Sequence, residues 1–412
     1  MQTLLKSRLS AMMFLQFFIW GGWFVTLGTY LATSLHASGA EIGSAYSTQS
    51  WGAIVAPFVV GLVADRYVSA ERLLGAIHLA GAVLMYLLSR AEQFAEFHPL
   101  LLTYMLLYMP TLALVNSIAF RALPDPRAHF PRVRLWGTIG WIVAGLAISY
   151  AFAWDAPEAL HGGLLSRTFL MCSVASLALG LYAFTLPRTP PLARAGGGRA
   201  TLAQAFGSDA LGLLRDRNFL VFFVASIFVC IPLAFYYQHA HQFLTEIGVE
   251  NAAGKQTLGQ ASEVLFMLAV PFFLVRVGVK WTLLLGMLAW ALRYLLFAFG
   301  DAGELAIFLL AGIALHGACY DFFFVVGQIY TDSRAGERYR SSAQGLITLA
   351  TYGVGMLIGF WMAGRVVDLH AGAGVHDWPA IWRVPAAIAA VVFAAFAFAF
   401  RGAPLASAER GR

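Results

Sequence analysis

Three polar side chains recur at helical spacing within an otherwise apolar stretch of the chain. Gln256, Gln260 and Glu263 lie four and three residues apart in the segment QTLGQASEVLFM, so a helix places them on one face. A carboxylate inside a membrane costs about 2.5–3.5 kcal/mol, and it usually faces a bundle interior or a wet cavity on the path of substrate or protons. The alternative is a helix-end glutamate that reaches headgroup water. Pro271 and Arg276 follow well after Glu263, which favours the interior position.

A second deep carboxylate follows in the segment LHGACYDFFFVVGQIY. Helical spacing places Asp321 on one face with Phe324 and Gln328, and Tyr320 lies beside it. A carboxyl group holds its proton in an apolar site and releases it beside an arginine, so one that moves between both can carry a proton. Asp321 is therefore the first candidate for a proton carrier and Glu263 is the second. Direct binding of substrate is also expected of Glu263.

Arg134 is the candidate counter-charge for these carboxylates, and Arg293 is a second arginine within the predicted spans. Arg293 lies deep in an apolar segment, where it requires an acidic or carbonyl partner. Arg134 aligns with Thr138 and Trp141 at i, i+4 and i+7 in the segment RLWGTIGW. Arg134 either anchors in the headgroup region, with no further role, or faces a cavity where it can pair with a carboxylate.

The elements that must position these side chains are membrane-spanning helices. Of the 412 residues, 60% are hydrophobic and 12% are charged, whereas about 25% of the residues in a soluble domain are charged. Apolar stretches of about 20 residues recur along the whole chain, each long enough to cross about 30 Å of hydrocarbon. We predict an all-α membrane protein with twelve transmembrane helices. They cover residues 11–34, 41–64, 71–90, 98–120, 134–153, 165–186, 218–243, 256–275, 280–299, 304–328, 341–364 and 380–400.

The order of these segments indicates two six-helix halves. The segment PFVVGLVADRY, at Pro57–Tyr67, has a counterpart in PFFLVRVGVKW at Pro271–Trp281, and each precedes an apolar stretch that contains Leu–Gly. A polar loop rich in Pro, Gly and Arg separates the two repeats. We therefore predict an N-terminal half over residues 1–186, a cytoplasmic linker over 187–217 and a C-terminal half over 218–412. Substrate is expected near the midplane between the halves.

Basic residues lie mainly on one side of this predicted topology. If both termini and every even-to-odd loop are cytoplasmic, most of the 27 Lys and Arg residues fall on the cytoplasmic side, as the positive-inside rule requires. Both termini are therefore expected in the cytoplasm, and the first span lacks the cleavage site of a signal peptide. The net charge of +6 therefore says little about nucleic acid, and none is expected as a partner.

Several function classes find no support in the sequence. Cys172, Cys230 and Cys319 lack metal-ligand spacing, and neither a metal nor a cofactor is expected. No Ser–His–Asp set, HExxH motif or Gly-rich phosphate loop is found, which argues against an enzyme. A sensor usually carries a soluble output domain, and the sequence shows none. A membrane sensor without transport therefore stays only as an alternative.

The end of the second predicted span resembles a loop of the major facilitator superfamily. The portion Gly61–x–x–Ala64–Asp65–Arg66 is similar to the pattern between the second and third helices of that superfamily, where the Asp helps to latch one conformation. Asp65 and Arg66 are the corresponding candidates for a conformational latch. The resemblance is imperfect at Val68, where Gly is usual, and at the next two positions, where basic residues are usual.

Longer segments resemble one family within that superfamily, the bacterial nucleoside:H+ symporters. They are FLQFFIWGGWFVTLG, YMPTLALVNSIAF, RLWGTIGW, SEVLFMLAVPFFLVRVG, RYLLFAFGD and CYDFFF, and they follow one another along nearly the whole chain. The resemblance implies the facilitator fold in a bacterial inner membrane. It also implies proton-driven uptake of purine or pyrimidine nucleosides by alternating access. The expected partners are a nucleoside, protons and membrane lipid, and the protein is expected to be a monomer.

The resemblance also implies a substrate site. Its motif-matched residues are Arg134, Thr138, Trp141, Gln260, Glu263, Tyr320 and Asp321. A nucleoside combines a flat base with a hydroxylated sugar, so its site needs aromatic walls and a few convergent hydrogen-bonding groups. Tyr237 and Phe324 can add to the walls, and Gln344 can add hydrogen bonds. Members of the family can present amides from helix 7, where this chain has Ala234 and Tyr237, so the base preference stays open. A sugar or another small polar solute is the alternative substrate.

Overall fold

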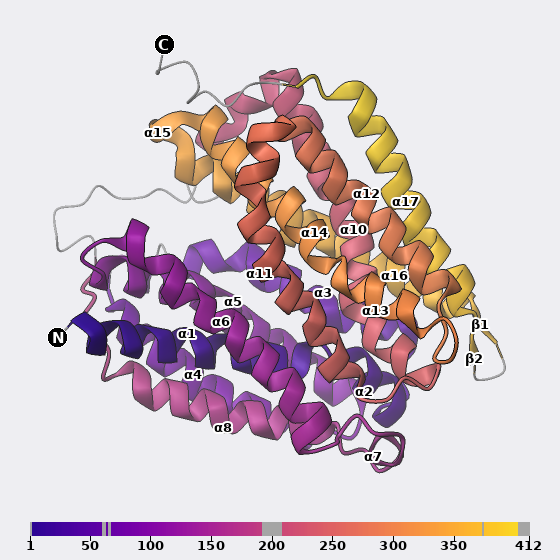
Figure 1. The fold of residues 1–412 in the computed structure, drawn as a ribbon. Coiled ribbons are helices and arrows are strands. Elements are labelled where there is room, and N and C mark those ends of the chain that lie inside the picture. Colours follow the sequence, from indigo (N-terminus) through magenta and orange to yellow (C-terminus); the bar gives the residue numbers. More distant parts are fainter. Residues whose placement is uncertain (1, 60–62, 65–66, 192–207, 373–374, 403–412) are drawn as a thin grey trace. The chain divides into compact units, whose positions relative to one another are not determined.

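The structure of the chain, a computed structural model, consists almost entirely of long helices (Figure 1). It describes residues 2–59, 63–64, 67–191, 208–372 and 375–402. The chain divides into two compact units. The first unit comprises Met1–Leu202 and Glu250–Thr257, and the second comprises Ala203–Val249 and Leu258–Arg412.

The helices of the first unit come from the N-terminal half of the sequence. They are α1 (Gln2–Phe24), α2 (Leu27–Ser34), α3 (Gly39–Val59), α4 (Ala70–Leu88), α5 (Phe94–Ala122), α6 (Pro126–Leu146), the π-helical turn η2 (Ala147–Ala151), α7 (Pro157–His161) and α8 (Ser166–Ala183). Helix α1 lies beside α6 and α8, and α4 lies beside α8 (Figure 1). Gly140 of α6 lies so close to the main chain of Phe14 in α1 that a β-carbon would collide with the carbonyl oxygen.

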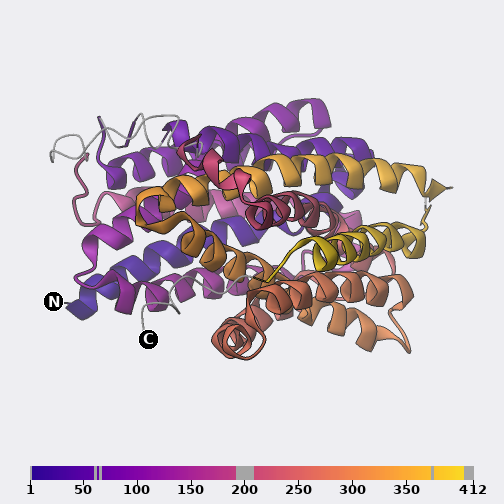
Figure 2. The ribbon, with the colours of Figure 1, turned by 90° about the horizontal axis from the view of Figure 1, so that it is seen from above.

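The second unit holds the remaining elements. They are the 3-10 helix η4 (Ser208–Arg215), α10 (Arg217–Glu246), most of α11 (Ala252–Arg276), α12 (Gly278–Phe299), α13 (Ala306–Ala314), α14 (His316–Tyr320), the π-helical turn η5 (Asp321–Val325), α15 (Val326–Thr348), the π-helical turn η6 (Leu349–Gly355), α16 (Met356–Leu369), β1 (Ala371–Gly372), β2 (Val375–His376) and α17 (Trp378–Ala399). Helices α12 and α17 lie side by side (Figure 1). The antiparallel β1–β2 hairpin joins α16 to α17 and projects beyond their ends (Figure 2).

Most of these helices are long and apolar enough to cross a membrane. Eleven such stretches occur among the described residues. The twelfth predicted span, 41–64, corresponds to α3, whose polar residues Ser47, Thr48, Gln49 and Ser50 are buried. The predicted all-α class with twelve transmembrane helices is thus confirmed, and the two-residue strands lie outside the spans.

Local chemistry explains several helix boundaries. The Asp216 carboxylate accepts hydrogen bonds from the backbone N–H groups of Asn218 and Phe219, at 2.8 and 3.2 Å, and so caps the start of α10. Asp377 caps α17 in the same way through the N–H of Ala380. Gly336 interrupts α15 with a φ of +64°, a conformation that L residues rarely adopt, and so separates two of the spans.

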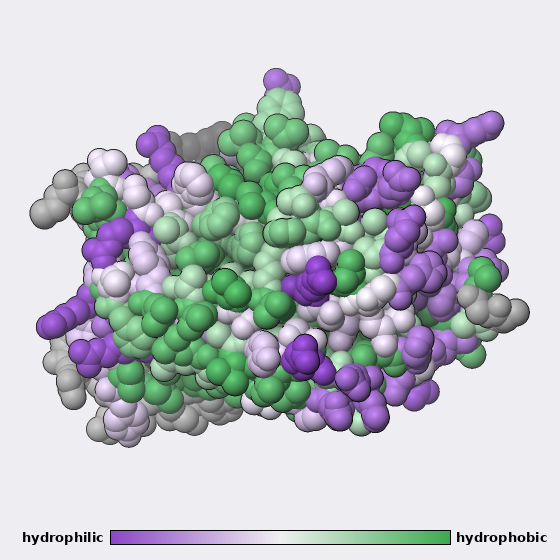
Figure 3. Space-filling view, turned by 90° about the horizontal axis from the view of Figure 1, so that it is seen from below, coloured by the Kyte–Doolittle hydropathy of each residue, from purple (hydrophilic) through white to green (hydrophobic). Residues whose placement is uncertain are grey.

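The outward side chains fit an apolar solvent. Helix α11 exposes Leu265, Leu268, Phe272 and Val275, the last at 86%. On the face drawn in Figure 3, hydrophobic residues form broad areas and hydrophilic residues gather mainly toward two opposite edges. Large exposed apolar areas mark a surface that contacts lipid or another apolar partner. The polar residues of α11 considered above therefore lie on a helix whose other faces are strongly apolar.

Candidate functional site

A chain of three polar side chains crosses the interior of the second unit. Arg293 of α12 donates from Nη1 to Nδ1 of His316 at 2.9 Å, and Nε2 of His316 lies 2.9 Å from Oε1 of Glu263 on α11. Arg293 and His316 are 0% and 1% exposed, whereas the Glu263 side chain is 20% exposed. The chain therefore begins at a fully buried cation and ends at a carboxylate that is open on one side.

The partner of Arg293 differs from the expected one. We predicted an acidic or carbonyl partner, but the guanidinium bonds the imidazole of His316, and its Cζ lies 3.4 Å from the ring centroid of Tyr236. This cation–π contact stabilises the charge of the Arg293 guanidinium, which no carboxylate contacts directly among the described residues. His316 is the first residue of α14, and its imidazole contacts both Arg293 of α12 and Glu263 of α11. Among the described residues, the guanidinium of Arg293 is therefore linked to Glu263 through this imidazole.

Asp321 has very different surroundings in the same unit. It begins the π-helical turn η5, and its side chain is fully buried. Neither carboxyl oxygen has a hydrogen-bond partner among the residues that the structure describes. A π-helical turn inside a longer helix is frequent at functional sites, because it changes the direction of the side chains around it. Asp321 is thus a deep carboxyl to which no side-chain donor or cation is bonded among the described residues.

Aromatic side chains line the region around His316. Its ring centroid lies 5.9 Å from that of Tyr320 and 6.3 Å from that of Tyr237. The hydroxyl of Tyr320 is hydrogen-bonded to that of Tyr352 at 2.9 Å, and its ring lies 5.0 Å from Phe324. The structure therefore brings Tyr237, Tyr320 and Phe324 into one aromatic group beside the Glu263 chain.

The two predicted amide residues have different positions. Gln260 is buried on α11, one turn before Glu263. Gln344 lies on the part of α15 after Gly336, and its amide donates to Oδ1 of Asp332 at 2.6 Å and to the carbonyl oxygen of Gln328 at 2.9 Å. These contacts tie Gln344 to the preceding part of α15 and do not join it to the aromatic group.

Three predicted residues lie on α6 in the first unit. The guanidinium of Arg134 lies 4.0 Å from the ring centroid of Phe17. Trp141 packs edge-on against Trp20 of α1, with ring centroids 5.7 Å apart. Thr138 lies on α6 between Arg134 and Trp141 in sequence. These contacts join α6 to α1. The candidate latch residues Asp65 and Arg66 lie outside the described residues.

The first unit also contains a buried polar network that the sequence analysis missed. Nε2 of His78 contacts Oε1 of Gln16 at 2.9 Å, and Nδ1 contacts Oγ of Ser176 at 3.0 Å. The amide nitrogen of Gln16 donates to Thr111, and the hydroxyl of Tyr108 donates to the carbonyl oxygen of Gln16. His78 and His316 were both missed, although each is a histidine within an apolar span, which is the signal that could have found them.

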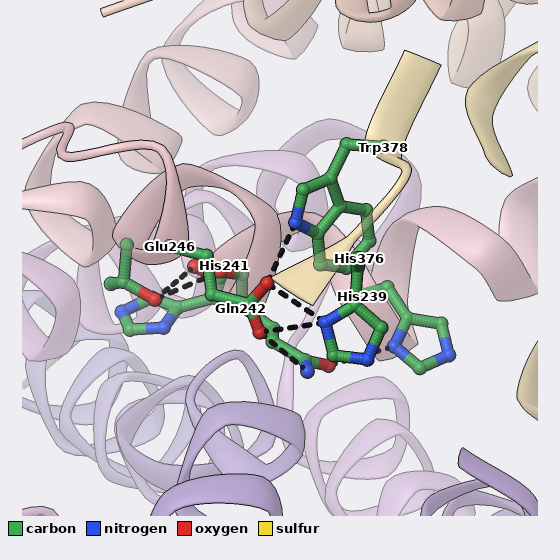
Figure 4. A network of polar contacts seen from close by, with 7 residues as sticks. His239, His241, Gln242, Glu246, His376 and Trp378 are labelled. Carbon is green, nitrogen blue, oxygen red and sulfur yellow. Dashed lines mark hydrogen bonds and ion pairs between the residues drawn. The ribbon is translucent and has the colours of Figure 1, made fainter. Parts of the chain in front are cut away.

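A third histidine network lies at the end of α10 (Figure 4). Glu246 accepts from Nε1 of Trp378 at 2.8 Å and from the amide of Gln242 at 3.0 Å, and its Oε2 lies 2.9 Å from Nδ1 of His376. His239 contacts Gln242 from the next turn back. The hydrogen bond with Glu246 raises the pKa of His376 above its ordinary value. No group of residues suited to a metal ion occurs in the described parts of the chain.

Comparisons with known proteins agree with this architecture. The family model described as "Nucleoside H+ symporter" matches residues 1–404. YegT of Escherichia coli (strain K12), named as a nucleoside transporter, is 44% identical over 96% of this chain and 93% of its own length. The xanthosine permease of the same organism is 35% identical over 96% of each chain. The crystal structure of a mutant of the nucleoside transporter NupG superposes with a TM-score of 0.89 and 30% identity, over 96% of this chain and 100% of that chain.

The fold and the buried polar side chains define a multi-pass membrane transporter with the facilitator fold. Like its relatives, it is a permease and not an enzyme. The chain belongs to the nucleoside H+ symporter family. The predicted family and the predicted function, symport of nucleosides with protons, are confirmed by these comparisons.

Proposed function

We propose that two carboxyl groups of the second unit divide the work of nucleoside–proton symport. The observation that carries this proposal is the contrast in their surroundings. Glu263 is hydrogen-bonded and charge-compensated through His316 and Arg293, whereas Asp321 is buried without a hydrogen-bond partner among the described residues. Glu263 binds the substrate, and Asp321 carries the proton.

Asp321 suits proton transport because its carboxyl group is buried and has no hydrogen-bond partner among the described residues. A buried carboxylate without a partner is far more costly than the neutral acid, so the site accommodates the protonated group. A conformation that brings water or a cation to the carboxyl stabilises the anion and releases the proton. The proton binds a carboxyl oxygen on one side of the cycle and passes to water on the other. Alternating access couples this exchange to movement of the nucleoside.

Glu263 suits substrate binding because its Oε1 is held by His316 and its side chain is open on one side. A ribose presents hydroxyl donors and a carboxylate is an acceptor, so the two are complementary. The aromatic group beside it offers faces for a base. We extend the substrate site from the contacts around His316 to Tyr237, Tyr320 and Phe324. From the sequence patterns alone we extend it further to Arg134, Thr138, Trp141, Gln260 and Gln344.

The setting of this cycle also follows from the sequence. We propose a location in the bacterial cytoplasmic membrane with both termini in the cytoplasm, because basic residues concentrate on that side. Residues 1–186 and 218–412 form the two moving halves in this proposal, and 187–217 link them. Asp65 and Arg66 latch one conformation. The protein acts as a monomer within lipid, and it uses no cofactor.

Uptake by purified protein in liposomes tests this proposal directly. Radiolabelled uridine and adenosine are supplied outside, with the external pH either equal to or below the internal pH. We expect the gradient to drive accumulation of both nucleosides above equilibrium, and an uncoupler to abolish it. Uptake that ignores the gradient would contradict the role of a proton carrier.

Competition distinguishes the remaining substrate classes. An excess of unlabelled uridine should inhibit adenosine uptake, whereas maltose or sucrose at the same concentration should not. Inhibition by the sugar and not by uridine would assign the site to another polar solute.

A further inference from the structure

We infer that His316 is a positioning residue that transmits the charge of Arg293 to Glu263 and reserves one Glu263 oxygen for hydroxyl donors of the substrate. The inference rests on the proposed role of Glu263 in binding nucleosides. It adds a residue that the sequence motifs did not assign.

The hydrogen bonds fix the tautomer of His316. Arginine has only donors, so Nδ1 of His316 must accept the hydrogen bond from Nη1 of Arg293. The neutral ring then carries its proton on Nε2 and donates it to Oε1 of Glu263. Protonation of Nδ1 would place a second cation against the guanidinium and break that bond. His316 is therefore a fixed neutral bridge rather than a proton carrier.

The bridge leaves a defined part of Glu263 open. Oε1 is occupied by His316, while Oε2 has no hydrogen-bond partner among the described residues, and the side chain is partly exposed. An ionised carboxylate can only accept hydrogen bonds. Oε2 therefore selects substrate groups that donate, and the ribose hydroxyls are the donors that purine and pyrimidine nucleosides share.

The charge balance of the region keeps Glu263 in this state. One cation and one carboxylate are joined through a neutral ring, so the three groups carry no net charge. Breaking the bridge leaves a buried cation and a carboxylate without compensation, and the carboxylate then takes up a proton more readily. The other titratable groups that act on Glu263 are Tyr237 of α10, Tyr320 of α14 and Asp321 of η5.

Two substitutions of His316 separate bridging from simple packing. His316→Phe keeps a ring but removes the acceptor and the donor. His316→Gln supplies one amide oxygen for Arg293 and one amide N–H for Glu263, so it can restore both bonds. Arg293→Gln removes the charge and keeps a donor toward His316. His370→Phe, at a histidine whose Nδ1 lies 2.9 Å from the carbonyl oxygen of Val366 in its own helix, is the matched control.

The measurement is the KM for uridine and for 2′,3′-dideoxyuridine in liposomes, with the external pH varied from about 5 to about 8. In the wild type we expect the uridine KM to change less than about twofold over this range, and the dideoxynucleoside to be a poor substrate. In His316→Phe the uridine KM should rise about tenfold or more, increasingly toward acid pH, and the preference for uridine should shrink. His316→Gln should restore the flat pH profile, and His370→Phe should behave as wild type.

Each outcome bears on one proposal. If His316→Phe does not fold, as judged by gel filtration in detergent, Arg293→Gln carries the test, and a KM that rises toward acid pH is again expected. A KM that stays flat with pH in both His316→Phe and Arg293→Gln, or a preference for uridine that is unchanged in both, overturns the role of His316. Failure of the wild type to accumulate nucleosides with a proton gradient overturns the proposed division of labour instead.

Discussion

The buried network around His78 in the first unit and the one around His316 in the second differ in the charge of their members and in the exposure of their terminal side chains. In the first unit, His78 joins Gln16 to Ser176, and all three groups are neutral and fully buried. In the second unit, His316 joins a cation to a carboxylate that is partly exposed. The first network is therefore closed, whereas the second ends at a side chain with an exposed part.

This difference separates a structural network from a functional one. A neutral network whose members satisfy one another stabilises the packing of helices and offers nothing to a substrate. A buried ion pair is a poor source of stability, because desolvation offsets its attraction, so its retention calls for another role. In the function proposed above, the open carboxylate of Glu263 supplies that role by binding substrate, and Asp321 in the same unit carries the proton. We therefore expect substitutions in the two networks to affect different measurements.

The largest effect is expected at the carboxyl without a partner. Asp321→Asn should abolish proton-driven accumulation of uridine, because the amide cannot exchange a proton, while exchange of internal for external uridine continues. The assay is uptake under a pH gradient beside counterflow without one. Asp301→Asn, an exposed carboxylate in the loop between α12 and α13, is the matched control. Concentrative uptake by Asp321→Asn equal to wild type would remove Asp321 from the mechanism.

The next effect concerns the closed network. His78→Phe leaves Oε1 of Gln16 without a donor, while the Ser176 hydroxyl can still donate to the backbone carbonyl oxygen of His78, so we expect a loss of about 1–3 kcal/mol of stability for the unsatisfied Gln16 oxygen. Thermal unfolding in detergent measures this loss, and the uridine KM of the folded variant should be unchanged. His98→Phe breaks an exposed contact with Ser44 and should cost less than about 0.5 kcal/mol. A selective rise in KM without loss of stability would contradict the structural role of His78.

A smaller effect tests whether ordinary buried hydrogen bonds count equally in both units. The hydroxyl of Tyr108 donates to the carbonyl oxygen of Gln16 at 2.6 Å, and that of Tyr294 donates to the carbonyl oxygen of Pro232 at 2.5 Å. Tyr108→Phe and Tyr294→Phe should each lower stability by about 1 kcal/mol. Neither should change the pH profile of uptake. A changed profile in one of them would extend the functional network to that tyrosine.

The smallest effect is expected at the partly exposed network of Figure 4. Because the hydrogen bond with Glu246 raises the pKa of His376, its contribution is complete below the ordinary histidine pKa of about 6.5 and is lost as pH rises through the raised value. Exposed pairs contribute at most about 1 kcal/mol. Hydrogen exchange of the β1–β2 amides should therefore quicken, beyond its intrinsic pH dependence, as the pH rises. Glu246→Gln should abolish this added dependence, and an unaltered profile would contradict it.

The fold was predictable because its signals are local. A long apolar stretch can satisfy its backbone in lipid only as a helix, so composition and length alone identified the spans. Helical spacing also placed Gln260 and Glu263 on adjacent turns of α11, as the structure has them. The family was predictable from segments such as RLWGTIGW and CYDFFF, which are continuous in sequence.

The partners of the buried charges were less predictable. The depth of Arg293 in its span indicated that it needs a partner, but an acidic or carbonyl group was expected and an imidazole was found. His316 gave no signal by spacing, since its two partners lie on other helices. Gln344 was expected to add hydrogen bonds to the substrate site, yet its amide is engaged by Asp332 and Gln328. Periodicity reports the face of one helix and not what lies opposite.

The sequence by itself determined that this protein is a helical membrane transporter, that it belongs to the nucleoside H+ symporters, and that Glu263 and Asp321 are its deep carboxyls. Only the tertiary structure decided that one carboxyl is bridged to a cation and the other is not. The physical reason is distance. The position of a helix and the face on which a residue lies follow from neighbours along the chain. The contacts that compensate a buried charge come from side chains a few ångströms away on three separate helices.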